Sequence, residues 1–173
     1  MIKAVGFAAQ AHAAQKRKYT GEPYINHCVA VASKVAEYTD NIGVVVAAVL
    51  HDTIEDTPVI ADDIEKEFGV VVRRLVLEVT DVSNPKDGNR AFRKKKDREH
   101  LAKCSIYGAT IKLADLYDNT KTIVQHDQDF AKVYVKEKAM IMPLLMHGPR
   151  QLWHEVDQQL GDAINFLIKQ GAW

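Results

Sequence analysis

The sequence predicts an all-α protein, a single compact helical bundle that spans residues 1–173 as one domain. Apolar residues recur at helical spacing in many segments, whereas the two-residue alternation of a half-buried strand is not evident between tight turns. Apolar residues make up 47% of the chain, which is enough to bury a core at this length. Neither a repeat nor a linker-like stretch suggests a boundary inside the chain.

The first two predicted helices are separated by a loop. Val5, Ala8, Ala9 and His12 open an amphipathic helix near the N-terminus. Residues 17–23 contain glycine and proline and read as a loop. The next helix covers residues 27–38, with apolar residues one turn apart along one face.

The following segment is the most apolar in the chain. A helix is expected from residue 42 to about residue 56, and it should be central because most of its faces are apolar. Pro58 cannot continue that helix but suits the start of the next one, which Gly69 should end as a C-terminal cap. Residues 70–79 are rich in β-branched side chains, yet their apolar residues fit a helical stripe better than a strand.

The C-terminal half continues with helices. Residues 83–89 read as a loop, and the basic run Arg93–Lys96 then reads either as a solvated helix face or as a lip that attracts polyphosphate. Three further helices, each carrying apolar residues at helical spacing, complete the prediction. They cover residues 106–124, 130–146 and 152–168.

Composition excludes several classes of protein. The chain carries 23 basic and 23 acidic residues, and this zero net charge argues against a general nucleic-acid binder. Cys28 and Cys104 form no zinc-binding pattern and suit buried thiols in a reducing cytoplasm. The N-terminus lacks a signal peptide, and the longest apolar run, residues 44–50, is too short to cross a bilayer. We therefore expect a cytoplasmic protein without a membrane partner, whose oligomeric state the sequence leaves open.

The strongest local motif is the hexapeptide from His51 to Asp56. In a continuous helix, His51 would lie one turn from Glu55, and Asp52 one turn from Asp56. Charged groups at the end of a buried helix need partners, and a metal ion is one possible partner. The alternative is a solvated helix end with one stray histidine.

Two more segments carry isolated polar residues. His27 stands at the start of a predicted helix, and Asp115 lies in an otherwise apolar stretch with Asn119 one turn later. Taken singly, His27 is more simply a helix cap, and Asp115 a salt-bridge partner of Lys112. Together with the hexapeptide they form a more specific pattern.

That pattern, a histidine, a His–Asp pair and a lone aspartate, resembles the metal site of the HD phosphohydrolase superfamily. The resemblance implies an all-α HD-domain bundle in which four residues hold one divalent ion, namely His27, His51, Asp52 and Asp115. Mixed nitrogen and oxygen ligands suit Mn²⁺, although other divalent ions are possible. Such an ion lowers the pKa of bound water and polarises a phosphoryl oxygen.

Segments around these residues resemble one family within the superfamily. Residues 11–18, 21–27, 50–57 and 112–115 are similar to the hydrolase domain of RelA/SpoT enzymes and to the metazoan SpoT-like small alarmone hydrolases. The resemblance spans about residues 5–145 and assigns Glu55 and Asp56 to positioning or activating the attacking water. It assigns contacts with a small nucleotide substrate to Arg17, Lys18, Asn119, Thr122 and Tyr134.

The expected activity is hydrolysis of the 3′-pyrophosphate of guanosine 3′,5′-bis(diphosphate) or its pentaphosphate, giving GDP or GTP and pyrophosphate. Cys28 stands where the family usually has proline, and Leu116 and Asp118 replace the usual basic and aromatic residues after the lone aspartate. Because of this change beside the site, the adenosine equivalent of ppGpp remains an alternative substrate. Another nucleotide phosphohydrolase, such as an NADPH phosphatase, and a silent nucleotide-sensing module are the remaining alternatives.

Overall fold

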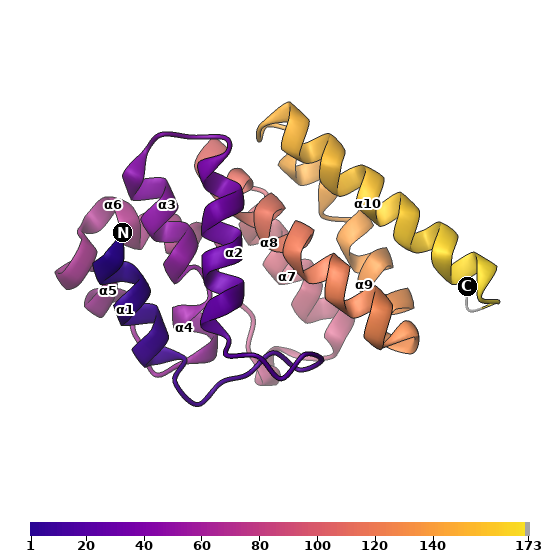
Figure 1. The fold of residues 1–173 in the computed structure, drawn as a ribbon, viewed down its shortest axis with the longest axis horizontal. Helices are drawn as coiled ribbons and strands as arrows, with labels where there is room; N and C mark the ends of the chain where they lie inside the picture. The colour runs from indigo at the N-terminus through magenta and orange to yellow at the C-terminus, as the bar shows by residue number, and fades with distance from the viewer. Residues whose placement is uncertain (172–173) are drawn as a thin grey trace.

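The computed structural model describes residues 1–171 of the protein. Within them the chain is helical, and the only β-type pairing is an isolated bridge between Lys16 and Pro23. The all-α prediction is confirmed. None of these helices is long and apolar enough to cross a membrane. In chain order, with η for 3₁₀ helices, the elements are α1 (Ile2–Ala11), α2 (Ile25–Ala36), α3 (Ile42–Leu50), α4 (Thr53–Asp56), α5 (Ala61–Phe68), α6 (Val70–Val79), η1 (Pro85–Asp87), α7 (Arg90–Leu101), α8 (Ile106–His126), α9 (Gln128–Ala139), η2 (Met142–Leu145) and α10 (Arg150–Lys169) (Figure 1).

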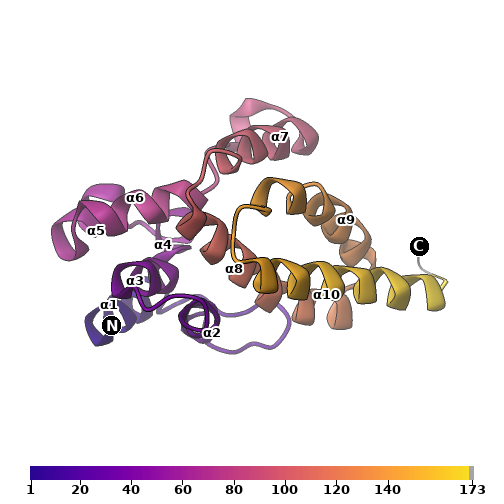
Figure 2. The same cartoon turned by 90° about the horizontal axis from the view of Figure 1, so that it is seen from above.

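Helix α8 runs through the middle of the molecule, with α1–α6 on one side and α9 and α10 on the other (Figures 1 and 2). Ile111 and Ala114 of α8 belong to the buried cluster formed by the N-terminal helices. Leu113 and Leu116, on another face of α8, belong to the cluster formed with α9 and α10. Because apolar residues on different faces of one helix serve both clusters, α8 is held on two sides. Any polar residue on its remaining face is thereby fixed in position.

The predicted helix over residues 70–79 is confirmed, and its apolar stripe is the buried face of α6. Val72, Leu75, Val76 and Val79 are all at most 5% exposed. The helix begins directly after Gly69, whose φ of +87° places it in a region that favours glycine. A helical period therefore outweighs the strand preference of β-branched residues here.

The predicted continuous helix from residue 42 to residue 56 is wrong, because the chain turns at His51 and Asp52 between α3 and α4. Two side chains donate hydrogen bonds to backbone carbonyls in the last turn of α3. His51 Nδ1 donates to the Ala48 carbonyl at 2.8 Å, and Thr53 Oγ1 donates to the Leu50 carbonyl at 2.6 Å. These bonds satisfy helix-end acceptors locally, so the helix can end inside the protein.

The predicted helix over residues 130–146 is also interrupted. Helix α9 begins earlier, at Gln128, because the Asp127 side chain accepts a hydrogen bond from the Phe130 N–H at 3.0 Å. It ends at Ala139, four residues before Pro143, where a continuing α-helix would clash with the proline ring. The basic run lies on helix α7, which Asn89 caps through the Phe92 N–H.

Candidate metal centre

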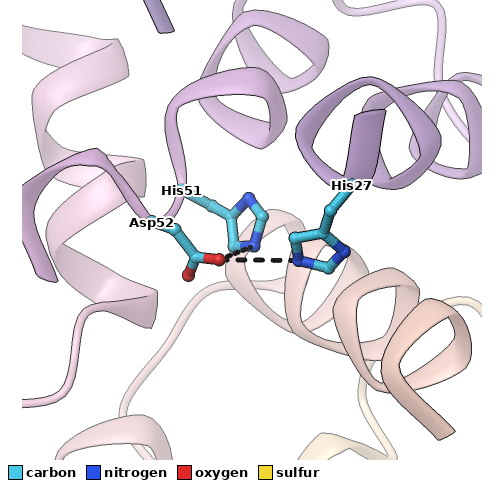
Figure 3. Close-up of side chains that lie close together, drawn as sticks. All are labelled: His27, His51 and Asp52. Atoms are coloured by element: carbon cyan, nitrogen blue, oxygen red, sulfur yellow. Dashed lines mark ion pairs between the residues drawn. The ribbon is translucent and has the colours of Figure 1, made fainter. Parts of the chain in front are cut away.

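Three side chains from the first half of the chain converge at one buried point (Figure 3). His27 comes from α2, while His51 and Asp52 come from the turn after α3. Asp52 Oδ2 lies 3.5 Å from His27 Nε2 and 3.0 Å from His51 Nε2. Asp115 on α8 completes the cluster, with its Oδ1 3.4 Å from His27 Nε2 and 3.8 Å from His51 Nε2. The fold thus brings together all four residues predicted to bind a metal.

Each imidazole is oriented by a bond on its other nitrogen. His27 Nδ1 lies 2.7 Å from Asp118 Oδ2, and His51 Nδ1 lies 2.8 Å from the Ala48 carbonyl. Both partners are acceptors, so the hydrogen-bond network assigns the ring proton to Nδ1 in each case. The two Nε2 atoms are buried and find no hydrogen-bond partner among the described residues. Each therefore presents a lone pair toward the carboxylates of Asp52 and Asp115.

The electrostatics of the cluster favour a cation. Burial lowers the pKa of His27, but the surrounding carboxylates, Asp115 foremost, outweigh it and raise that pKa to about 11. Burial also lowers the pKa of His51, and Asp52 reverses the shift and raises it to about 9. Burial would raise the pKa of Asp115, yet Lys112 and the imidazoles hold it well below its usual range. A divalent ion can supply the positive charge that protons supply otherwise.

The donor set fits such an ion. Two imidazole nitrogens without a hydrogen-bond partner face the carboxylates of Asp52 and Asp115, and lone pairs and negative charges this close repel one another unless a cation lies among them. No thiolate takes part, which distinguishes the set from a structural zinc site. Nitrogen and oxygen ligands of this kind suit divalent manganese, iron or zinc.

The two predicted catalytic acids lie on α4, next to the cluster. Glu55 Oε1 accepts the Asp81 N–H at 2.5 Å, and Asp56 Oδ2 accepts from Gln15 Nε2 at 2.9 Å. Desolvation of the Glu55 carboxyl raises its pKa to about 7, although Lys112 opposes that rise. Neither acid contacts a ligand side chain by a hydrogen bond or ion pair in the described part of the chain.

A polar group beside the cluster gathers three of the residues predicted to contact substrate. Arg17 Nη1 donates to Asn119 Oδ1 at 2.7 Å, and Arg17 Nη2 donates to Thr122 Oγ1 at 3.1 Å. Arg17 Nη2 also lies 3.2 Å from Asp118 Oδ2. Arg17, Asn119 and Thr122 border a hollow of about 360 Å³, which lies within the usual size range of small-molecule pockets.

The other two predicted substrate contacts lie apart from this group. Lys18 is largely exposed at the rim of the same hollow, where its Nζ bonds Asp127 Oδ2 at 3.2 Å. Tyr134 is 5% exposed and packs in the C-terminal core, with its hydroxyl 3.3 Å from Thr120 Oγ1. A substrate contact by Tyr134 stays a prediction.

Two residues of the centre were not predicted there, Asp118 and Tyr24, whereas the Lys112–Asp115 ion pair was the alternative interpretation of Asp115 in the sequence. Asp118 orients His27, Tyr24 donates to Asp52 Oδ2 at 2.7 Å, and Lys112 Nζ lies 2.9 Å from Asp115 Oδ2. A signal for Asp118 was present, because it lies three residues after Asp115 and therefore on a neighbouring part of the same helix face. The contact of Tyr24 with Asp52 joins residues 28 positions apart, so no spacing within one helix indicates it.

Comparison with known proteins gives consistent matches. Residues 4–141 match the family model described as HD domain. The human guanosine-3′,5′-bis(diphosphate) 3′-pyrophosphohydrolase MESH1 is 42% identical over 98% of this chain and 93% of its own length. The Aquifex aeolicus enzyme of the same activity is 36% identical over 84% of this chain, which covers 21% of that longer protein. The solved structure of a metazoan SpoT orthologue that hydrolyses ppGpp matches with a TM-score of 0.80 and 31% identity, over 99% of this chain and 96% of that one.

Proposed function

The chain belongs to the HD-domain family, among the guanosine-3′,5′-bis(diphosphate) 3′-pyrophosphohydrolases, and on that premise we propose that it hydrolyses ppGpp and pppGpp with manganese as its metal. The products are GDP or GTP and pyrophosphate. The observation that carries this proposal is the pair of orphaned histidine nitrogens facing Asp52 and Asp115. That arrangement leaves a place for an ion and gives it the mixed ligands that manganese accepts.

The proposed reaction is a displacement at phosphorus. The oxygen of a water forms a bond to the phosphorus next to the sugar, and the bond from that phosphorus to the ribose 3′ oxygen breaks. The 3′ oxygen leaves with a proton, and both phosphorus atoms depart as pyrophosphate. A bound divalent ion supplies a more acidic water and neutralises charge on the phosphoryl oxygens.

The acids of α4 are proposed to act on that water. Glu55 has a pKa near 7, so at neutral pH it can accept a proton from the water and pass it on. Asp56 is held by Gln15, which in turn lies 2.6 Å from His12 Nδ1. This tether suits a residue that orients the water more than one that exchanges protons.

The proposed nucleotide site is the hollow bordered by Arg17 and Asn119. The guanidinium of Arg17 is held by side-chain oxygens, and its fixed fork suits phosphate oxygens. Lys18 at the rim adds a second cation, and Thr122 offers a hydroxyl. Tyr134 can reach the sugar only if the segment after α8 moves, because its hydroxyl is now on Thr120.

The proposed setting is the cytoplasm, with a small nucleotide as the partner. Both cysteines are free and buried, as expected in a reducing compartment.

A nucleotide panel tests the proposed function. The purified protein would be incubated with manganese and with ppGpp, its adenosine equivalent, NADPH and simple monophosphates, and the products resolved by chromatography. We expect ppGpp to be consumed fastest, with pyrophosphate as the product. Release of orthophosphate alone, from NADPH or from monophosphates, would refute the proposal and leave a general HD phosphohydrolase.

A further inference from the structure

A second, partly enclosed cavity is lined by residues from the end of α6 and from helices α7, α8 and α9. Its volume is about 40 Å³, roughly three times the minimum that holds one water. That space admits a few waters or the oxygens of one phosphoryl group. Four basic side chains line it: Lys94, Arg98, Lys112 and Lys138.

Two of these cations have carboxylate partners. Lys94 Nζ lies 2.6 Å from Asp81 Oδ2, and Lys112 Nζ lies 2.9 Å from Asp115 Oδ2. Two further acids line the cavity. Asp97 accepts from the Ser83 N–H at 2.8 Å and lies 3.5 Å from Lys94, and Glu137 is engaged by Arg90 from outside the cavity through two hydrogen bonds. Each carboxylate that lines the cavity therefore already has a hydrogen-bond or ion-pair partner.

The other two cations, Lys138 and Arg98, make no ion pair within the described residues. The ammonium of Lys138 lies 5.1 Å from the ring centroid of Tyr134, which is a weak contact compared with a carboxylate. Desolvation, followed by repulsion from Lys112, lowers the pKa of Lys138 to about 8. A half-buried ammonium without a carboxylate partner is stabilised by an anion.

The cavity adjoins the reaction site through two residues. Lys112 lines the cavity and contacts the ligand Asp115, and Asp81 lines it while donating its N–H to Glu55. Along one face of α8 the order is therefore Lys112, then Asp115, then Asn119 one turn further on. The cavity lies on one side of the metal ligands and the nucleotide hollow on the other.

We propose that this cavity receives the terminal phosphoryl group of a 3′-diphosphate, with Lys138 and Arg98 as its counter-charges. The proposal rests on the proposed function, in which the inner phosphorus is attacked at the metal centre. The nucleoside then extends toward Asn119, and the second phosphate extends past Lys112. One phosphoryl group matches the volume, and its charge matches the two unpaired cations.

This subsite provides a way to distinguish diphosphates from monophosphates. A nucleotide with a single phosphate at the metal would leave Lys138 and Arg98 without an anion. A 3′-diphosphate would pair with both, and so would the pyrophosphate product. The site therefore contributes to the choice of substrate without contacting the base or the sugar.

The test is the affinity of inorganic pyrophosphate and of guanosine 3′-monophosphate for the parent and for Lys138→Met. Both are measured by calorimetry on the metal-free protein and as inhibition of the manganese-loaded protein. We expect Lys138→Met to bind pyrophosphate roughly ten- to a hundred-fold more weakly, the loss typical of a hydrogen bond to a charged group. Affinity for guanosine 3′-monophosphate, whose single phosphate would lie at the metal centre, should stay within about threefold. Lys138→Arg should keep most of the pyrophosphate affinity, and Lys132→Met, on the same helix α9 but outside the cavity, should bind like the parent.

Pyrophosphate affinity of Lys138→Met within threefold of the parent, or an equal loss for guanosine 3′-monophosphate, would overturn the proposal. Circular dichroism of each variant confirms folding, and Arg98→Gln gives a second, independent change of the same site. If the parent fails to hydrolyse ppGpp while pyrophosphate binding still depends on Lys138, the proposed function fails and the anion site stands. If hydrolysis is normal and binding is unaffected, the anion site alone is refuted.

Discussion

The Asp118 carboxylate accepts a hydrogen bond from His27 Nδ1 at 2.7 Å, and the same oxygen lies 3.2 Å from Arg17 Nη2. One side chain thus joins a candidate metal ligand to the wall of the nucleotide hollow. Such outer contacts fix the orientation and protonation of a metal-binding histidine.

Asp118→Asn should weaken manganese binding by roughly ten- to a hundred-fold, because the amide can still accept from Nδ1 but lacks the negative charge that makes the ring a better ligand. Competition with a chelator of known affinity measures the change. Asp129→Asn, which alters an almost fully exposed aspartate, is the control. Equal affinities in both variants would mean that Asp118 does not tune His27.

Asp115→Ala should lose manganese and activity while helical content persists. Because Lys112 would lose its carboxylate, the variant should also be less stable by about 3–5 kcal/mol. Adding Lys112→Met should restore the melting temperature without restoring the metal. Metal analysis and circular dichroism separate the two effects. A single variant that keeps full metal and full turnover would contradict the ligand assignment.

Glu55→Gln should keep manganese and nucleotide binding, yet kcat should fall about a hundred- to ten-thousand-fold, as expected on loss of a positioned base. Asp56→Asn should have a smaller effect, since Asp56 is tethered by Gln15. Single-turnover rates at saturating manganese make the comparison. Rates within about threefold of the parent would show that these acids only solvate the end of α4.

The dependence of kcat on pH should reflect the ionisation of Glu55. Glu55 must be ionised to accept a proton, and its pKa is raised to about 7, so kcat should fall as pH drops below that value. A bound cation lowers the midpoint and never raises it. The profile is measured together with metal content at each pH, because protonation of the ligands would also reduce activity. If Glu55→Gln shows an unchanged acidic limb at full metal occupancy, another group is responsible.

The sequence was sufficient for features that depend on local periodicity. The buried stripe of α6 and the end of α5 at Gly69 follow from spacing and from one glycine. The break at His51 and Asp52 did not follow, because neither glycine nor proline marks it. It arises from side chains that bond nearby carbonyls, and these bonds depend on burial of the turn.

For the site, too, the sequence indicated some residues, while others become evident only in the folded structure. The motifs indicated four candidate ligands, which the fold brings together, and residues 4–141 match the HD family. The contact of Asp118 with His27 joins residues 91 positions apart, and the sequence suggested only added negative charge there. Lys138 offered no signal, since its missing partner is a property of the packed cavity. The assignment of residues 1–173 to one domain stays a prediction.

The most direct test of the central claim is the fate of solvent oxygen during hydrolysis of ppGpp in oxygen-18 water with manganese. Mass spectrometry of the quenched reaction should find one labelled oxygen in pyrophosphate and none in GDP, because water attacks phosphorus and the ribose 3′ oxygen is retained. Label in orthophosphate with no pyrophosphate formed, or label in the nucleoside product, would contradict the claim that the protein removes the 3′-pyrophosphate as a unit.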